Sequence, residues 1–167
     1  MDTYEFKRKL ADLAIAALET ERDGALQGEK YSKEEAASHV GAMESRYDTF
    51  KEEAQYLAAG HLRRRVEIEQ WLHELRRFKD DARCVSPTNK VRLGALVKIQ
   101  DYATNECRIY FLVPAGGGNA FQVDDESVTT LNVASPLAQS MILKDAGDEA
   151  TLHTKGGDKT LLILSVR

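Results

Sequence analysis

The sequence lacks the features of a disulfide-rich, zinc-binding or membrane-spanning protein. Its 167 residues include only two cysteines, Cys84 and Cys107, too few and too far apart for a metal knuckle or a disulfide framework. No stretch approaches the roughly 18 apolar residues of a membrane helix, and the start MDTYEFKRKL lacks the apolar core of a signal peptide. We therefore expect reduced structural thiols, no membrane partner and a location in the cytoplasm.

A large excess of one charge is also absent. The formal net charge is -4, which argues against a protein that coats nucleic acid through bulk electrostatics. The charges are nevertheless unevenly placed, because residues 29–53 carry seven acids against four bases and residues 61–79 carry six bases against three acids. The N-terminal half is thus acidic first and basic further along.

Proline is absent from residues 3–79, where alanine, leucine, glutamate, lysine and arginine dominate, as is typical of long helices. Apolar residues recur there at spacings of three and four, which predicts a coiled-coil seam. We expect two antiparallel helices that form a hairpin over residues 1–80. The predicted seam comprises Phe6, Leu10, Leu13, Ala17, Ala36, Val40, Met43, Tyr47, Phe50, Ala54, Leu57, His61, Arg64, Ile68, Trp71, Leu75 and Phe78.

Two positions are candidates for the turn of this hairpin. The stretch Gly24–Gly28 is followed by Ser32 and Glu35, which match a capping box at a helix start. The neighbourhood of Gly41–Lys51 gives arms of similar length and puts the acidic residues at the free end. We favour the second position, and both remain open at this stage.

After a linker at residues 81–90, the pattern changes to strands. Six stretches rich in valine, leucine, isoleucine and threonine alternate with turns over residues 91–167. One short helix interrupts them, with Ser135 as its N-cap, Pro136 at its first position and Gly147 after its end. The sequence predicts an α+β protein, in which a small antiparallel β-sheet with one short helix follows the helical hairpin.

Four stretches of the chain, SPLAQSMILKDAGDEA, LGALVKIQD, YFLVPAGGG and KEEAQYLAA, resemble the bacterial Gre transcript-cleavage factors. SPLAQSMILKDAGDEA (residues 135–150) is similar to the family's Ser-Pro and Gly-Asp-Glu segment, and LGALVKIQD and YFLVPAGGG are similar to its first C-terminal strands. KEEAQYLAA (residues 51–59) resembles the family's hairpin signature. The family's helix-ending glycine is Leu143 here, where we expect only packing to change. The resemblance implies an FKBP-like C-terminal domain, and RNA polymerase and nascent RNA as partners.

It also implies a mechanism and a set of residues. Gre factors insert the hairpin into the secondary channel of RNA polymerase and help the polymerase's own active site to cut backtracked RNA, so the protein would be no enzyme alone. Glu52 falls on the family's glutamate, whereas the family's catalytic aspartate falls on Thr49, with Asp48 one residue earlier. Such a step turns a helical side chain by about 100°. We expect Asp48 and Glu52 to assist catalysis and to share the polymerase's Mg²⁺, with no cofactor bound alone.

The same resemblance suggests contact residues in both halves of the chain. We expect the arginine cluster to contact RNA phosphate or the channel wall and a second group to shape the polymerase-docking surface. The cluster is Arg63, Arg64 and Arg65, and the docking group is Ser135, Pro136 and Asp148. Read without the resemblance, charged residues on a long exposed helix mainly solvate it, and Ser135 needs no role beyond capping.

Two other functions remain open. One is a regulator that occupies the same channel without assisting cleavage, which the displaced aspartate favours. The other is a prolyl isomerase in which aromatic residues of the C-terminal domain line a pocket. Those residues are Tyr102, Tyr110, Phe111 and Phe121.

Overall fold

The computed structural model of the chain describes residues 2–38, 44–81, 84 and 88–167, with the side chains of all of these except residues 38 and 44–50. Contacts between residues divide the chain into two compact units, Met1–Ala16 with His73–Arg167 and, separately, Ala17–Leu72. The two ends of the N-terminal half, up to Ala16 and from His73, thus belong with the sheet. The predicted domain limits of 1–80, 81–90 and 91–167 stay a prediction.

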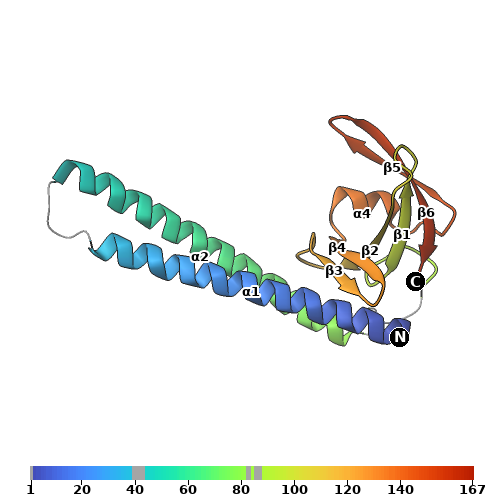
Figure 1. The fold of residues 1–167 in the computed structure, drawn as a ribbon, viewed down its shortest axis with the longest axis horizontal. Coiled ribbons are helices and arrows are strands. Elements are labelled where there is room, and N and C mark those ends of the chain that lie inside the picture. The colour runs from blue at the N-terminus through green and yellow to red at the C-terminus, as the bar shows by residue number, and fades with distance from the viewer. Residues whose placement is uncertain (1, 39–43, 82–83, 85–87) are drawn as a thin grey trace. The chain divides into compact units, whose positions relative to one another are not determined.

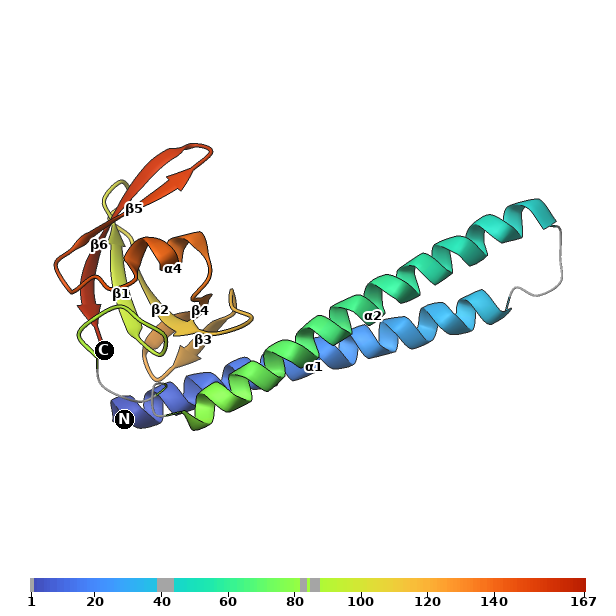
Figure 2. The ribbon, with the colours of Figure 1, turned by 180° about the vertical axis from the view of Figure 1, so that it is seen from behind.

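Two long helices account for the proline-free half of the chain. Helix α1 spans Thr3–Ser38 and helix α2 spans Glu44–Asp80. They run antiparallel and side by side (Figures 1 and 2). Late residues of α2 therefore pair with early residues of α1, as in the ion pair between Lys79 and Asp12. The predicted hairpin is confirmed.

The alternative turn at Gly24–Gly28 is wrong, since these residues lie inside α1. Nothing in that stretch breaks the helix, because isolated glycines only weaken a helix by about 1 kcal/mol each. Of the favoured turn, Gly41–Lys51, the first three residues lie outside the described residues, and from Glu44 onward the chain is already helical.

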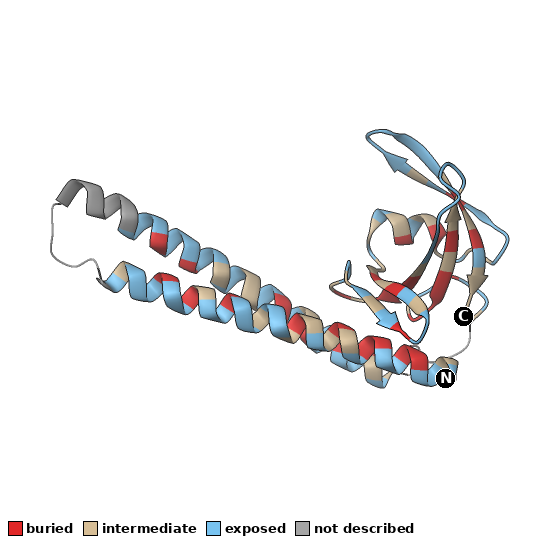
Figure 3. Cartoon of the chain, viewed as in Figure 1, coloured by how far each residue is buried: buried red, intermediate tan, exposed pale blue. Residues whose placement is uncertain are grey.

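The seam between the helices contains large apolar side chains near the base of the hairpin, where α1 begins and α2 ends, and small side chains further out. Leucine and isoleucine side chains fill the base, where each fully buried one contributes about 1.5–3 kcal/mol. Beyond them, the buried apolar side chains in the described part of the helices are alanines, accompanied by Glu29 and Ser32 (Figure 3). The base residues are Leu10, Leu18, Ile68, Leu72 and Leu75, and the alanines are Ala25, Ala54 and Ala58.

Two predicted seam positions of α2 are displaced by one residue. Leu57 is 54% exposed while Ala58 is buried, and Leu72 is buried rather than Trp71. Ala54, Ile68 and Leu75 keep the seven-residue spacing, so only the second apolar position of the heptad lies one residue later than predicted, at Ala58 and Leu72.

The C-terminal part forms one six-stranded sheet and a short helix. The sheet order is β3-β4-β2-β1-β6-β5. The strands are β1 (Leu96–Asp101), β2 (Cys107–Val113), β3 (Ala120–Val123), β4 (Glu126–Asn132), β5 (Glu149–Thr154) and β6 (Gly157–Val166), and the helix is α4 (Pro136–Met141). All six predicted strands are present, and the predicted α+β class is confirmed.

The sheet is mixed rather than wholly antiparallel, which corrects one aspect of the prediction. Strands β2 and β4 pair in parallel, with Ile109 opposite Val128. The parallel pair arises because β3 lies outside β4, so that β4 returns between β2 and β3 in the direction of β2. Sequence patterns locate strands but do not specify which neighbours pair.

Helix α4 packs on the sheet through Ala138 and Met141, which join a core of residues from β1, β2, β5 and β6. Its start matches the prediction, because the Ser135 hydroxyl accepts a hydrogen bond from the Ala138 main-chain nitrogen at 3.3 Å and Pro136 follows. Its end comes earlier than predicted. Leu143 then adopts a left-handed φ of 65°, so this departure from the family's glycine affects the backbone and not packing alone.

A buried lysine and a buried cysteine lie at the base of the helices. The Lys7 side chain has no exposed surface, and burial lowers its pKa to about 8. Cys84 is also fully buried, and burial raises the pKa of its thiol to about 11. Neither Cys84 nor the exposed Cys107 forms a disulfide. Neither of the two long helices, over its described residues, is apolar enough to cross a bilayer.

Candidate functional site

The two predicted carboxylates lie near the start of α2. Asp48 is four residues into the helix and its side chain lies outside the described part of the structure, whereas Glu52 is described and exposed. Because the main chain is helical from Glu44, the two positions are one turn apart on the same side of α2, at a rise of about 6 Å. Glu52 lies about 12 Å from the first residue of a helix about 55 Å long, and thus near one of its ends.

Arg64 ties the two helices together. Its guanidinium donates to the Glu21 carboxylate of α1 at 2.9 and 2.5 Å and to Glu67 of α2 at 2.6 Å. It also lies over the ring of Trp71, with 4.7 Å from its central carbon to the ring centroid. These contacts with two carboxylates and an aromatic ring hold the half-exposed Arg64 side chain in one position. The hydrogen bonds of its guanidinium are therefore made within the hairpin.

Arg65, the next residue along α2, has a similar role. It donates to Glu29 of α1 at 3.2 Å and to Glu69 of α2 at 2.9 Å. Glu29 is almost buried and also accepts a hydrogen bond from Lys33 at 2.5 Å. The hydrogen bond from Lys33, followed by that from Arg65, holds the pKa of Glu29 below its usual range.

Arg63 differs from its two neighbours. It is exposed, and no ion pair or hydrogen bond of its side chain is found within the described part of the chain. Of the three predicted contact arginines, Arg63 is therefore the one whose guanidinium faces solvent with its binding capacity unused. Across the helix pair, Arg65 joins the basic stretch to the acidic stretch through Glu29, whereas Arg64 and Lys79 pair with acids that precede residue 29.

The predicted docking residues are placed by the turns around α4. Ser135 and Pro136 begin α4, as described above. Asp148 lies in the turn between α4 and β5, where its carboxylate accepts a hydrogen bond from the Asp145 main-chain nitrogen at 2.8 Å. Each of the two polar side chains therefore has a structural role, and the exposed Pro136 adds a rigid apolar surface.

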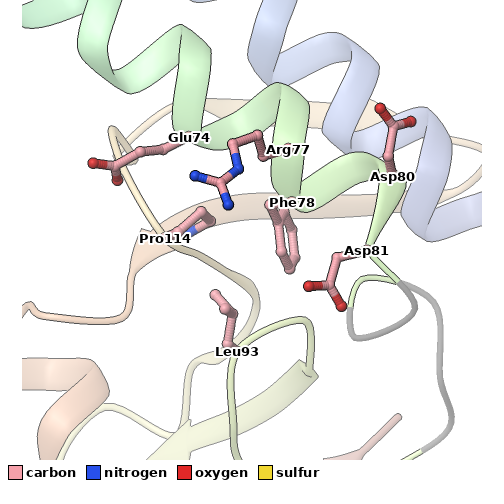
Figure 4. A pocket seen from close by; sticks show the side chains of 7 residues that line it. All are labelled: Glu74, Arg77, Phe78, Asp80, Asp81, Leu93 and Pro114. Carbon is pink, nitrogen blue, oxygen red and sulfur yellow. The ribbon is translucent and has the colours of Figure 1, made fainter.

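A cavity of about 460 Å³ lies in the unit that contains the sheet, where α2 ends (Figure 4). Phe78, Leu93 and Pro114 supply its apolar walls, and charged side chains of both signs surround them. The charged residues are Glu74, Arg77, Asp80 and Asp81. This mixture differs from the predominantly apolar lining of most small-molecule sites.

The comparison with known proteins decides the family. The sequence model of one protein family, the C-terminal domain of the transcription elongation factors GreA and GreB, matches residues 86–167. GreA of Cereibacter sphaeroides is 34% identical over 119 residues, which cover 70% of this chain and 74% of that protein. GreA of Methylococcus capsulatus is 34% identical over 122 residues, covering 70% and 72%. The chain belongs to the GreA/GreB family.

Solved structures of Gre-factor homologues are also similar over most of the chain. GreA factor homolog 1 (Gfh1) of Thermus thermophilus is 15% identical and covers 92% of this chain and 94% of its own, with a TM-score of 0.36. Gfh1 of Thermus aquaticus is 19% identical, covering 93% and 92%, with a TM-score of 0.37. The family of this chain rests on the sequence matches.

Membership of the GreA/GreB family makes this chain a transcription elongation factor that acts on RNA polymerase. Such factors are accessory proteins and not enzymes themselves. Among the described residues, no group of three or more histidine, cysteine or acidic side chains is arranged to hold a metal ion.

The four aromatic residues that suggested an isomerase pocket lie in different segments of the chain or on opposite faces of the sheet. Tyr110 belongs to the core beside α4, whereas Phe111, next to it in β2, points to the opposite face and lies 6.1 Å from the ring of Phe78. Phe121 is in the edge strand β3, and Tyr102 follows β1 and is exposed. These four residues do not line one pocket.

One exposed residue near Glu52 was not found by sequence reasoning. Tyr56 is 80% exposed, beside Leu57, which the heptad pattern had assigned to the seam. The spacing carries no signal for this surface, because a 3.6-residue period places Leu57 in line with the buried Leu75, five turns later.

Proposed function

We propose that the hairpin of this GreA/GreB-family protein enters the secondary channel of RNA polymerase, where Asp48 and Glu52 stimulate cleavage of backtracked RNA. The observation that carries the proposal is the position of Glu52, an exposed carboxylate one helical turn from Asp48 near the start of a long helix. A helix of this length, about 55 Å, suits a probe that reaches a deep active centre.

The two carboxylates suit the chemistry of the polymerase's metal site. Mg²⁺ prefers oxygen ligands and keeps several of its waters, so it often takes only one or two carboxylates from a protein. A Mg²⁺ ion shared with the polymerase would supply Lewis-acid activation of the attacking water. In this chain Glu52 offers an exposed carboxylate for the shared ion, and Asp48, one turn away, offers a second.

The remaining site residues take supporting roles in the proposal. Arg63 contacts the phosphates of the nascent RNA or the wall of the channel, whereas Arg64 and Arg65 keep the helices together. The surface around Ser135, Pro136 and Asp148 docks on the outside of the polymerase. Because bacterial RNA polymerase works in the cytoplasm, the proposal places the protein there.

One observation favours a second candidate function. Thr49, not an acid, stands at the position of the family's catalytic aspartate, and Asp48 is turned from it by about 100° in a helix. If this rotation moves the carboxylate away from the ion, the protein occupies the channel and competes with cleavage factors without assisting cleavage.

The test is RNA cleavage by a backtracked polymerase complex, with and without the protein. We expect the wild-type protein to accelerate cleavage, and Asp48→Asn or Glu52→Gln to lose at least tenfold of that acceleration. Glu34→Gln is the matched control, because Glu34 is an exposed glutamate of α1 and is not part of the carboxylate pair.

No acceleration by the wild-type protein, together with inhibition of a second, active cleavage factor, would support the second candidate instead. Acceleration that survives both carboxylate substitutions would reject the role of Asp48 and Glu52.

A further inference from the structure

Four side chains near the start of α2 form one exposed surface. Glu52, Glu53, Tyr56 and Leu57 stand at positions i, i+1, i+4 and i+5, so they lie on one side of the helix, and they line the same shallow hollow. Tyr56 is the most exposed large apolar residue in the described part of the chain, at 80%. We call this group the Tyr56 patch.

The hairpin itself does not need the patch. In this part of α2 the side chains buried against α1 are Ala54 and Ala58, and no hydrogen bond or ring contact of Tyr56 is found within the described residues. Tyrosine buries a large area on binding at low cost in side-chain entropy and is enriched among the residues that dominate protein interfaces. An exposed Tyr-Leu pair therefore favours a partner outside the hairpin.

The charges around the pair indicate the chemistry of that partner. Glu52 and Glu53 border Tyr56 and Leu57 on one side, and these carboxylates repel the phosphates of a nucleic acid. The described lysines nearby, Lys33 and Lys51, line a different hollow together with alanines. Charge complementarity thus fits a protein surface with an apolar centre and a basic edge better than it fits RNA.

We infer that the Tyr56 patch docks on an apolar, basic-edged protein surface of the RNA polymerase, and that this contact positions Glu52. The inference rests on the proposed function, because it takes the partner to be the polymerase that the hairpin enters. Tyr56 follows Glu52 by one turn, a rise of about 6 Å on the same side of α2. A contact at Tyr56 therefore fixes the depth and the rotation of the helix at which Glu52 meets its target.

The experiment measures the affinity of the full-length protein for core polymerase without nucleic acid. We expect Tyr56→Ala to weaken binding about tenfold or more and Leu57→Ala to weaken it by a smaller factor. Tyr56→Phe keeps the ring and should bind within twofold of the wild type. Tyr31→Ala is the matched control, because Tyr31 is 69% exposed on α1, and it should also bind within twofold. Equal far-UV circular dichroism excludes loss of helix as the cause.

The second measurement places a photo-cross-linking amino acid at position 56 in a backtracked complex. We expect cross-links to a polymerase subunit. Cross-links mainly to RNA would overturn the inference and point to base stacking, and Tyr56→Ala binding as tightly as the wild type would also overturn it.

These outcomes separate the inference from the proposed function. If Tyr56→Ala weakens binding although the wild-type protein stimulates no cleavage, the docking surface stands and the cleavage role fails. If cleavage is stimulated and Tyr56→Ala changes neither binding nor cleavage, the cleavage role stands and the docking surface fails. A wild-type protein that binds no polymerase overturns both.

Discussion

Replacing Leu143 with glycine should stabilise the sheet domain. Leu143 follows α4 with a φ of 65°, a conformation that costs a residue with a Cβ atom about 1–2 kcal/mol. Hydrogen bonds hold it there, because its main-chain nitrogen donates to the Val91 carbonyl at 2.9 Å and its carbonyl accepts from the Lys90 ammonium at 3.4 Å. Its side chain is 69% exposed, so removing it sacrifices little packing.

Glycine also gains freedom in the unfolded chain, which offsets about 0.5–1 kcal/mol of the relief. We therefore expect Leu143→Gly to raise the free energy of unfolding by about 0.5–1 kcal/mol. Leu143→Ala keeps the Cβ atom and should change it by less than about 0.5 kcal/mol. Urea unfolding followed through the NMR amide signals of β1 reports on this domain. Equal stability of the two variants, or a less stable glycine variant, would refute the reasoning.

Three further predictions concern individual contacts. Arg64→Ala should destabilise the hairpin by about 1 kcal/mol and Arg63→Ala by less than about 0.5, as measured by urea unfolding monitored through tryptophan fluorescence; equal losses would contradict the pairing described above. Ser135→Ala should cost about 1 kcal/mol through loss of the N-cap and Ser135→Asp should restore it, so a polymerase-binding defect in the aspartate variant would reveal docking rather than folding. Burial lowers the pKa of Lys7 from 10.5 to about 8, so the folded state binds fewer protons than the unfolded state above pH 8 and its stability should rise with pH, by at most about 1.4 kcal/mol per unit. Burial raises the pKa of Cys84 from 9.0 to about 11, which opposes this rise in stability above pH 9. Between pH 8 and 9, therefore, the stability of the wild type should rise with pH and that of Lys7→Met should not. Equal slopes of stability against pH in the two proteins would exclude the effect.

The helices and strands were predictable because their signals are local. A proline-free stretch of 77 residues rich in helix formers, residues 3–79, leaves few alternatives to long helices, and Ser135 and Pro136 mark the start of α4 by side-chain chemistry alone. The seam was displaced at Leu57 because spacings of three and of four residues both fit one side of a helix, and only packing against α1 selects Ala58.

The unpredicted features depend on contacts between distant residues. The parallel pairing of β2 and β4 follows from the position of β3 at the edge, which no local pattern encodes. Likewise, the sequence placed three arginines in a row, but only the register of the two helices decides that Arg64 meets Glu21 while Arg63 faces solvent.

The candidate site was predictable only to a limited extent. Glu52 was located through its resemblance to the family signature, and the structure describes it as exposed near the start of α2. The role of Asp48 stays a prediction, because its side chain lies outside the described residues.

The dependence of RNA cleavage on Mg²⁺ concentration tests the role of the hairpin carboxylates most directly. If Glu52 helps to hold an ion shared with the polymerase, the wild-type protein should lower the Mg²⁺ concentration that gives half-maximal cleavage in a backtracked complex. Glu52→Gln should lose this effect, and Glu34→Gln, a change of an exposed glutamate on α1, should retain it. The same Mg²⁺ dependence with the wild-type protein, with Glu52→Gln and with no factor at all would contradict the role of Glu52 in holding a shared ion.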